Sequence, residues 1–206
     1  MDIDKQVENV EKAVGAGRHN FHKNVKLHEA TEKEETGIRE QFKYIMFRGN
    51  YAFATDAGIA VAANLESISD FDVVEQLLLD GKKISGDVYK RILSHERVTV
   101  TEDGFEVLDE PCEVFYHFAE DKGTFPDVEK ILDNFRQTEQ ESVEYITFDV
   151  KRIERLRKAM GVTKLRLDMR NNRSAVRVIP DKKDYDVRGI IMLMLTEDSA
   201  TEEQAR

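Results

Sequence analysis

The order of apolar and polar positions is clearest in the C-terminal third of the chain. Residues Val143–Phe148 have the apolar content of a strand, and apolar residues then recur every three or four positions after Asp149. This spacing predicts a helix from Asp149 to about Met160, because Gly161 is a typical helix-terminating residue. Three further strands are predicted at Lys164–Arg170, Ala175–Ile179 and Arg188–Leu195.

Two earlier segments repeat this order of a helix and three strands less clearly. A helix is predicted over Asp4–Val14, and another follows Ser85, which is a typical N-cap residue. Val73–Leu79 fits either a helix or a strand. The strands predicted in these segments are Phe42–Phe47, Tyr51–Thr55, Ile59–Leu65, Arg97–Thr101, Phe105–Leu108 and Glu113–Ala119.

Repetition of one supersecondary unit predicts an α+β protein with a repeat architecture, with about three βαβββ units in the chain. The first two units are expected to form one domain over residues 1–134. The polar stretch Ile131–Ser142 favours a connector, with a linker at 135–142. The third unit would occupy 143–195, followed by an acidic, disordered tail at 196–206.

Charge is distributed unevenly along the chain, whose formal net charge is −10. Asp149–Arg170 contains eight basic and three acidic residues, so a basic island lies within an acidic protein. No apolar run approaches the roughly 20 residues of a membrane span, and the N-terminus lacks the pattern of a signal peptide. The single cysteine, Cys112, favours a reducing compartment, so we expect a cytoplasmic protein.

The helix expected after Asp149 has two chemically different faces. Its apolar face consists of Val150, Ile153, Leu156 and Met160. Its cations lie opposite, with Arg152 at the edge, and these are Lys151, Arg155 and Lys158. Such a face is either an ordinary solvated surface or a strip that contacts nucleic-acid phosphates without reading bases.

A second group of cations repeats this pattern on and before the helix that follows Ser85. It consists of Lys82, Lys83, Lys90 and Arg91. No aromatic residues interleave either group, which disfavours a groove that stacks single-stranded bases. Contact with the backbone of duplex DNA fits these cations better.

Four motifs, in order along the chain, together resemble the bacterial-type DNA sliding clamp, the β subunit of replicative DNA polymerase. The segment "FKYIMFRGNYAFATDAGIAV" resembles the hairpin and Ala-Thr-Asp-Gly turn of the middle clamp domain. "KKISGDVYKRIL" resembles a strand-to-helix step, and "DKGTFPDVEKIL" resembles the family's Gly-x-Phe-Pro-Asp-Tyr signature. "VEYITFDVKRIERLRKAMGVTKLRL" with "VRGIIMLML" is similar to the end of the last domain, so the resemblance covers about 42–195.

The resemblance implies a ring with outer sheets and inner basic helices, closed by several copies of the chain. It also implies a pocket for peptides of a polymerase or clamp loader, where the turn meets the C-terminal strand. The matching pocket positions are Thr55, Gly58, Ile59, Ala60, Leu132, Ile190, Met192, Leu193 and Met194. The sequence departs from the family at two places in this pocket. The family's turn usually continues with His and Arg, whereas this chain has Ala57-Gly58-Ile59, and Met-Leu-Met replaces the family's Met-Pro-Met. Asp56 is expected to shape the turn through its own side-chain hydrogen bonds.

Other constellations of reactive residues do not support a catalytic site. His19, His22 and His28 lie in a segment without cysteine and are interpreted as surface residues rather than metal ligands. Cys112 and His117 would point to opposite faces of a strand. "GKKISG" lacks the order of a phosphate-binding loop, and Asp70 and Asp72 are expected to be solvated.

Three functions remain open on these grounds. The first is a clamp-like processivity factor that tethers a polymerase to duplex DNA, without catalysis, cofactor or metal. The second is a clamp-fold interaction or regulatory module that binds a replication partner without encircling DNA. The third is a small-molecule-binding α+β domain, for which the chain offers no evident set of convergent polar residues.

Overall fold

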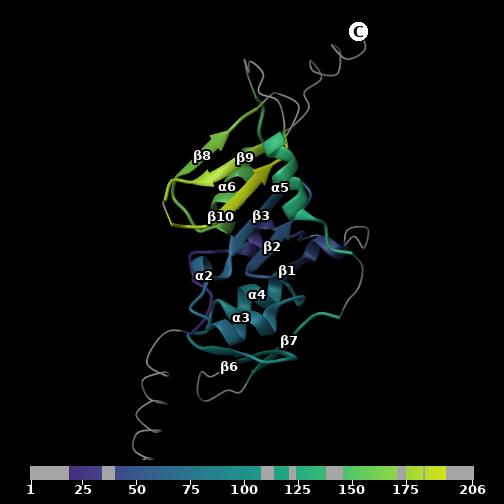
Figure 1. The fold of residues 1–206 in the computed structure, drawn as a ribbon, viewed down its shortest axis with the longest axis vertical. Helices are drawn as coiled ribbons and strands as arrows, with labels where there is room; N and C mark the ends of the chain where they lie inside the picture. The colour runs from purple at the N-terminus through teal and green to yellow at the C-terminus, as the bar shows by residue number, and fades with distance from the viewer. Residues whose placement is uncertain are drawn as a thin grey trace, which may run out of the picture.

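The computed structural model describes residues 19–33, 40–107, 114–120, 124–137, 146–170, 175–182 and 184–193 (Figure 1). The predicted helix at Asp4–Val14 and the acidic tail at 196–206 lie outside these residues. The described chain is a mixed α+β structure with antiparallel sheets, as the order of its elements predicts. Among the described helices, none has both the length and the hydropathy to cross a membrane.

A seven-stranded antiparallel sheet forms the larger layer, in the strand order β4-β1-β2-β3-β10-β9-β8. Its strands are β1 (Tyr44–Arg48), β2 (Tyr51–Thr55), β3 (Ile59–Asn64), β4 (Lys83–Ser85), β8 (Leu165–Asp168), β9 (Val176–Pro180) and β10 (Val187–Ile191). The central pair, β3 with β10, joins segments that are more than a hundred residues apart along the chain. The C-terminal unit therefore shares one sheet with the first unit instead of standing apart from it.

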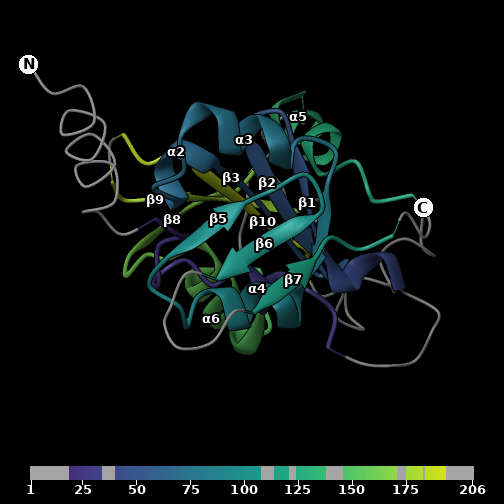
Figure 2. The same ribbon diagram turned by 90° about the horizontal axis from the view of Figure 1, so that it is seen from below.

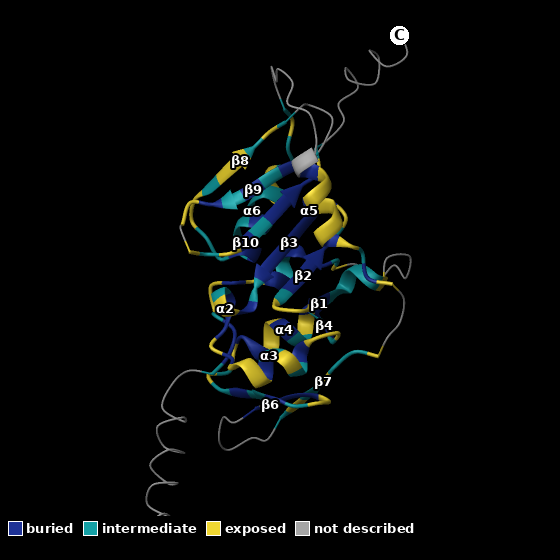
Figure 3. Cartoon of the chain, in the orientation of Figure 1, coloured by how far each residue is buried: buried dark blue, intermediate teal, exposed yellow. Residues whose placement is uncertain are grey.

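The two faces of this sheet are covered by different helices. Alternate residues of β3, such as Ile59 and Val61, point to an inner core that is covered by η1 (Leu27–Ala30), α4 (Gly86–Ile92) and α6 (Val150–Met160). The residues between them, Ala60 and Ala62, point to an outer cluster that is covered by α5 (Val128–Gln137). The views in Figures 2 and 3 show the central strands buried between these two layers.

A smaller lobe packs below the large sheet in Figure 1. It contains a three-stranded sheet of β5 (Val98–Val100), β6 (Gly104–Val107) and β7 (Phe115–His117), together with α2 (Leu65–Ile68) and α3 (Val73–Leu79). The ring of Phe105 lies 6.0 Å from that of Phe21 and 6.2 Å from that of Phe71, which ties the small sheet to the inner core. A 3-10 turn, η2 (Glu40–Lys43), precedes β1.

The ends of α6 and α4 agree with the signals in the sequence. The Asp149 side chain accepts a hydrogen bond from the Lys151 N–H at the start of α6, and Gly161 ends the helix in the left-handed conformation, with φ of 68°. Ser85 caps α4 in the same way. Both helix boundaries are confirmed to within a residue or two.

Two expectations about secondary structure differ from the observed fold, and one open alternative is decided by it. Ile146–Phe148, the described part of the expected strand 143–148, forms no strand. Val128–Gln137 is helical, although a connector was predicted from Ile131, because Val128, Leu132 and Phe135 bury an apolar stripe on the sheet. The ambiguous segment Val73–Leu79 is a helix, and Asp72 closes its first turn through a capping box with Glu75.

Candidate functional site

Asp56 holds the turn between β2 and β3. Its Oδ1 accepts hydrogen bonds from the N–H groups of Gly58 and Ile59, both at 2.8 Å. The Thr55 hydroxyl donates to the Ile59 carbonyl and accepts from the Ala57 N–H, and Ala57 has a φ of 69°. The expectation that Asp56 shapes the turn through its own hydrogen bonds is confirmed.

The second oxygen of Asp56 binds a cation of α6. Arg155 Nη1 lies 2.7 Å from Asp56 Oδ2, and the Asp56 side chain is only 9% exposed. The same guanidinium donates through Nε to the Glu29 carbonyl at 2.8 Å and through Nη2 to the Thr31 carbonyl at 3.1 Å. Arg155 was expected in a solvent-facing row, and this placement is wrong because η1 packs against that side of α6.

The other cations of α6 stay nearer to solvent. Lys151 is exposed, and Lys158 is 39% exposed with its Nζ 3.7 Å from Glu154. Arg157 binds Glu154 through two hydrogen bonds, of 2.8 and 2.9 Å, and these lower the pKa of Glu154 to about 2. Val150 was expected on the buried stripe but is 76% exposed; it is the first residue of α6, and the buried residues of this helix lie toward its C-terminal end.

Arg152 lies against the turn that Asp56 closes. A Cβ atom placed on Gly58 would be 2.8 Å from Arg152 Cζ, so the guanidinium packs closely against the backbone of this turn. Arg152 and Arg155 therefore both contact this turn, and their contacts hold α6 against it.

The cations of the second group separate into two sets. Lys90 and Arg91 are exposed at the C-terminal end of α4, which packs against η1 as α6 does, on the same side of the sheet (Figure 2). Lys82 Nζ donates to the Glu102 carbonyl at 2.8 Å and lies over the Phe118 ring. The prediction that Lys83 faces a nucleic acid is wrong, because Lys83 lies in β4 and is only 8% exposed.

The residues expected to form the peptide pocket divide between the two faces of the large sheet, and most of them are buried. Ile59 belongs to the inner core and Leu193 packs against it, whereas the outer cluster contains Ala60, Leu132 and Ile190. Ala60 pairs with Ile190 across β3 and β10, and the Met192 N–H donates to the Gly58 carbonyl at 2.9 Å. The buried members of the set are Thr55, Gly58, Ile59, Ala60, Leu132 and Ile190. Leu193 is half-buried, Met192 is 43% exposed, and Met194 lies outside the described residues. Among the described members of this set, Met192 is therefore the most exposed.

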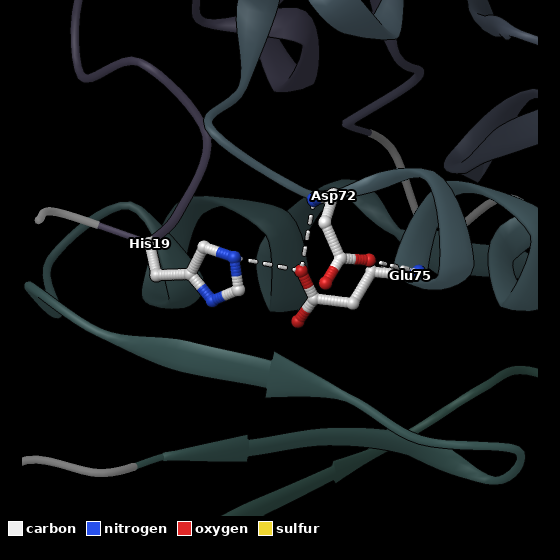
Figure 4. Close-up of side chains that lie close together, drawn as sticks. All are labelled: His19, Asp72 and Glu75. Carbon is white, nitrogen blue, oxygen red and sulfur yellow. Dashed lines mark hydrogen bonds and ion pairs between the residues drawn. The ribbon is translucent and has the colours of Figure 1, made fainter. Parts of the chain in front are cut away.

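The three N-terminal histidines do not converge on one point. His19 Nε2 lies 2.8 Å from Glu75 Oε2, and His22 Nε2 lies 3.1 Å from Asp70 Oδ1. His19, Asp72 and Glu75 form a cluster (Figure 4), a grouping that the sequence did not suggest because Glu75 comes from α3. Both Glu75 oxygens already accept backbone N–H groups, from Val100 and Asp72, so the cluster acts as a helix cap. Burial raises the pKa of Glu75.

His28 lies in a cavity of about 360 Å³ between η1 and α4. Its Nδ1 is buried and has no hydrogen-bond partner among the described residues. Burial lowers the pKa of His28 to about 4, against the opposing effect of Glu29. The folded protein therefore holds this imidazole in its neutral form at neutral pH.

This depressed pKa predicts a loss of stability in mild acid. Between about pH 6.5 and 4 the unfolded chain binds a proton at His28 that the folded chain does not, so the free energy of unfolding falls as the pH falls. We expect His28→Gln to lose less stability than the unaltered protein over this window. Urea unfolding of both proteins at several pH values measures the difference, and parallel pH curves would contradict the assignment.

Comparison with known proteins bears on the fold alone. No protein-family model matches the sequence, and no curated protein matches it. Among solved structures, the chain is similar to the DnaN sliding clamp of Bartonella birtlesii bound to griselimycin, with a TM-score of 0.57 and 14% identity over 87% of this chain and 67% of that chain. It is also similar to the Helicobacter pylori beta clamp bound to a DNA ligase peptide, with a TM-score of 0.56 and 14% identity over 83% and 62%.

A third similar structure is the DNA polymerase sliding clamp of Bacillus subtilis, with a TM-score of 0.56 and 10% identity over 84% of this chain and 62% of that chain. The fold expected from the sequence, that of the DNA clamps, is confirmed by these matches. The chain spans 62–67% of the length of these three clamps.

Proposed function

We propose that this chain is a sliding-clamp-like protein that tethers a replication factor to duplex DNA through sequence-independent contacts. The observation that supports this most is the placement of two cation-bearing helices, α4 and α6, which both pack against η1 on the same side of a sheet with the clamp fold. Lys90, Arg91, Lys151 and Lys158 are the cations proposed to meet phosphates. Contacts of this kind do not depend on base sequence, so they permit sliding.

The topological part of this proposal is tested with circular and linear DNA. We expect the protein, assembled into a closed oligomer, to be retained on nicked circular duplex DNA and to be lost when the circle is cut. Native mass spectrometry of the same sample gives the number of chains. Equal retention on circular and linear DNA would contradict encirclement, whatever the measured mass.

One observation favours a second candidate, a clamp-fold module that binds a replication partner without encircling DNA. Two of the cations expected to meet DNA, Arg155 and Lys83, are held within the protein, which leaves fewer cations for contact with phosphates. This candidate predicts a stable monomer that binds a partner peptide and is not retained on circular DNA. The experiment above separates the two.

We further propose that both candidates bind a partner peptide at Met192, the most exposed described member of the predicted pocket. The Helicobacter pylori clamp, to which the chain is similar in fold, is bound to a DNA ligase peptide, and this supports the proposal. We expect Met192→Glu to weaken binding of that same peptide at least tenfold, on the order of the cost of placing a charge in an apolar contact. Fluorescence anisotropy with a labelled peptide measures it. Met169→Glu is the matched control, because Met169 is 40% exposed and Met192 is 43% exposed.

A further inference from the structure

The cavity beside His28 is lined by polar side chains from separate segments of the chain. These segments are η1 with the residues that follow it, η2, the end of β4 and the helix α4. The cavity volume of about 360 Å³ lies within the range of pockets that hold small molecules. Of the residues proposed to contact DNA or a peptide, only Lys90 borders this cavity. Most of its polar lining therefore has no part in those contacts.

Three lysines from different elements line the cavity. Lys33 follows η1, Lys43 ends η2, and Lys90 belongs to α4. Lys33 and Lys43 were not among the cations expected from the sequence to meet DNA, because they lie apart from each other and from the basic groups along the chain. Only the packing of η1 and η2 beside α4 brings the three ammonium groups around one space.

The carboxylates of the lining are partly engaged with Lys33. Glu29 Oε2 lies 2.9 Å from Lys33 Nζ, and Glu32 Oε1 accepts from the Lys33 N–H at 3.0 Å. An ammonium group has three donors, so the pair with Glu29 leaves two donors of Lys33 for a ligand. Within the described part of the chain, Lys43 and Lys90 form no ion pair with a carboxylate. The lining therefore retains cationic donors that the protein itself does not neutralise.

Ser85 and His28 add uncharged polar groups to these cations. The Ser85 Oγ accepts from the Val88 N–H at 3.1 Å, so the hydroxyl proton remains for an acceptor in the cavity. The His28 imidazole borders the same space and stays neutral at neutral pH, because burial lowers its pKa to about 4. The ammonium groups of Lys90 and Lys33 act on the His28 pKa in the same direction as burial, against Glu29.

We propose that this cavity binds a phosphate group, held by the ammonium groups of Lys33, Lys43 and Lys90 together with the Ser85 hydroxyl. Phosphate oxygens accept several charge-assisted hydrogen bonds at once, which suits donors that converge from separate elements. The phosphate belongs either to a small phosphate ester or to the backbone of duplex DNA. Both sources present the same oxygens, so the site does not depend on DNA tethering.

Inorganic pyrophosphate tests the site in the full chain. Calorimetric titration should show saturable binding at one site, and Lys33→Gln/Lys43→Gln should weaken this binding at least tenfold. The matched control is Lys164→Gln/Lys182→Gln, which removes the same charge from a second hollow, of about 270 Å³, beside Tyr185. Equal weakening by the two double variants would indicate general attraction to a charged surface and overturn the proposal.

Duplex DNA distinguishes the two sources of the phosphate. If DNA supplies it, Lys33→Gln/Lys43→Gln should lower the affinity for duplex DNA at least fivefold, and pyrophosphate should compete with DNA. If a small ester supplies it, the variant should lose pyrophosphate binding and keep the DNA affinity of the control. The proposal is overturned when the variant binds both pyrophosphate and DNA as the control does. Failure of the unaltered protein to bind DNA would contradict the tethering function alone, because the pyrophosphate titration does not involve DNA.

The signals of the histidine rings report where the ion binds. Addition of pyrophosphate should shift the NMR signals of the His28 ring, which borders the cavity, and leave those of His117 in place. His117 is exposed on β7 and serves as the control ring. Saturable binding without a change at His28 would place the ion elsewhere and overturn the proposal.

Discussion

Charge reversal on the two inner helices should lower the affinity for duplex DNA by on the order of a hundredfold at low salt. The combined variant carries Lys151→Glu and Lys158→Glu on α6, with Lys90→Glu and Arg91→Glu on α4. Each phosphate contact contributes about 0.9 to the slope of log affinity against log salt, so the loss of four contacts should reduce that slope by about 3 to 4. Arg155 is left unchanged because Asp56 and two backbone carbonyls already bind its guanidinium.

A pair of cations on the opposite side of the sheet provides the control. Arg48 and Lys130 are exposed, and they lie with α5 and the outer cluster rather than with α6. Arg48→Glu/Lys130→Glu changes the net charge as much as Lys151→Glu/Lys158→Glu does. A fluorescence-anisotropy titration at several salt concentrations compares the two pairs. If both weaken binding equally, the effect reflects net charge, and the assignment of an inner DNA-facing surface fails.

Removal of the Asp56 side chain should destabilise the fold by about 2–4 kcal/mol. Asp56→Ala leaves two backbone N–H groups without acceptors and leaves the half-buried guanidinium of Arg155 without its carboxylate. The measurement is urea unfolding followed by circular dichroism. A double-mutant cycle with Arg155→Met isolates the ion pair, since the two single losses should sum to more than the loss of the double variant.

The exposed pair between Glu154 and Arg157 is the control for this experiment. It lies on the same helix, and Glu154→Gln should leave the unfolding midpoint nearly unchanged because solvent already stabilises both charges. An unfolding midpoint for Asp56→Ala that matches that of Glu154→Gln would show that the turn and α6 are not coupled through Asp56.

Local signals in the sequence were sufficient for single elements. Asp149 and Gly161 predict both ends of α6 because a cap and a left-handed terminus depend on neighbouring residues only. Asp56 was expected to close its turn for the same reason, since the hydrogen bonds that close the turn reach no further than Ile59. The clamp fold was indicated by the order of four such segments rather than by any one of them.

The site depended on contacts that no local pattern contains. Helical spacing placed Arg155 opposite the buried stripe, yet η1 packs there and takes the guanidinium into the structure. Lys83 is buried in β4 although its sequence neighbours suggested a basic surface. The polar stretch that begins at Ile131 predicted a connector, yet its first part belongs to α5. No local pattern shows that the small outward residues Ala60 and Ala62 leave space for a helix.

Local elements could be predicted and tertiary contacts could not, because the two depend on interactions of different range along the chain. Periodicity, caps and turns are settled among residues within about five positions of one another, so the amino-acid sequence alone specifies where helices and strands begin and which side of each is apolar. Whether a cation meets solvent or a buried carboxylate depends on which distant segment packs beside it. The pairing of β3 with β10 and the contact of Arg155 with Asp56 arise only when the chain folds, because they join residues about a hundred positions or more apart.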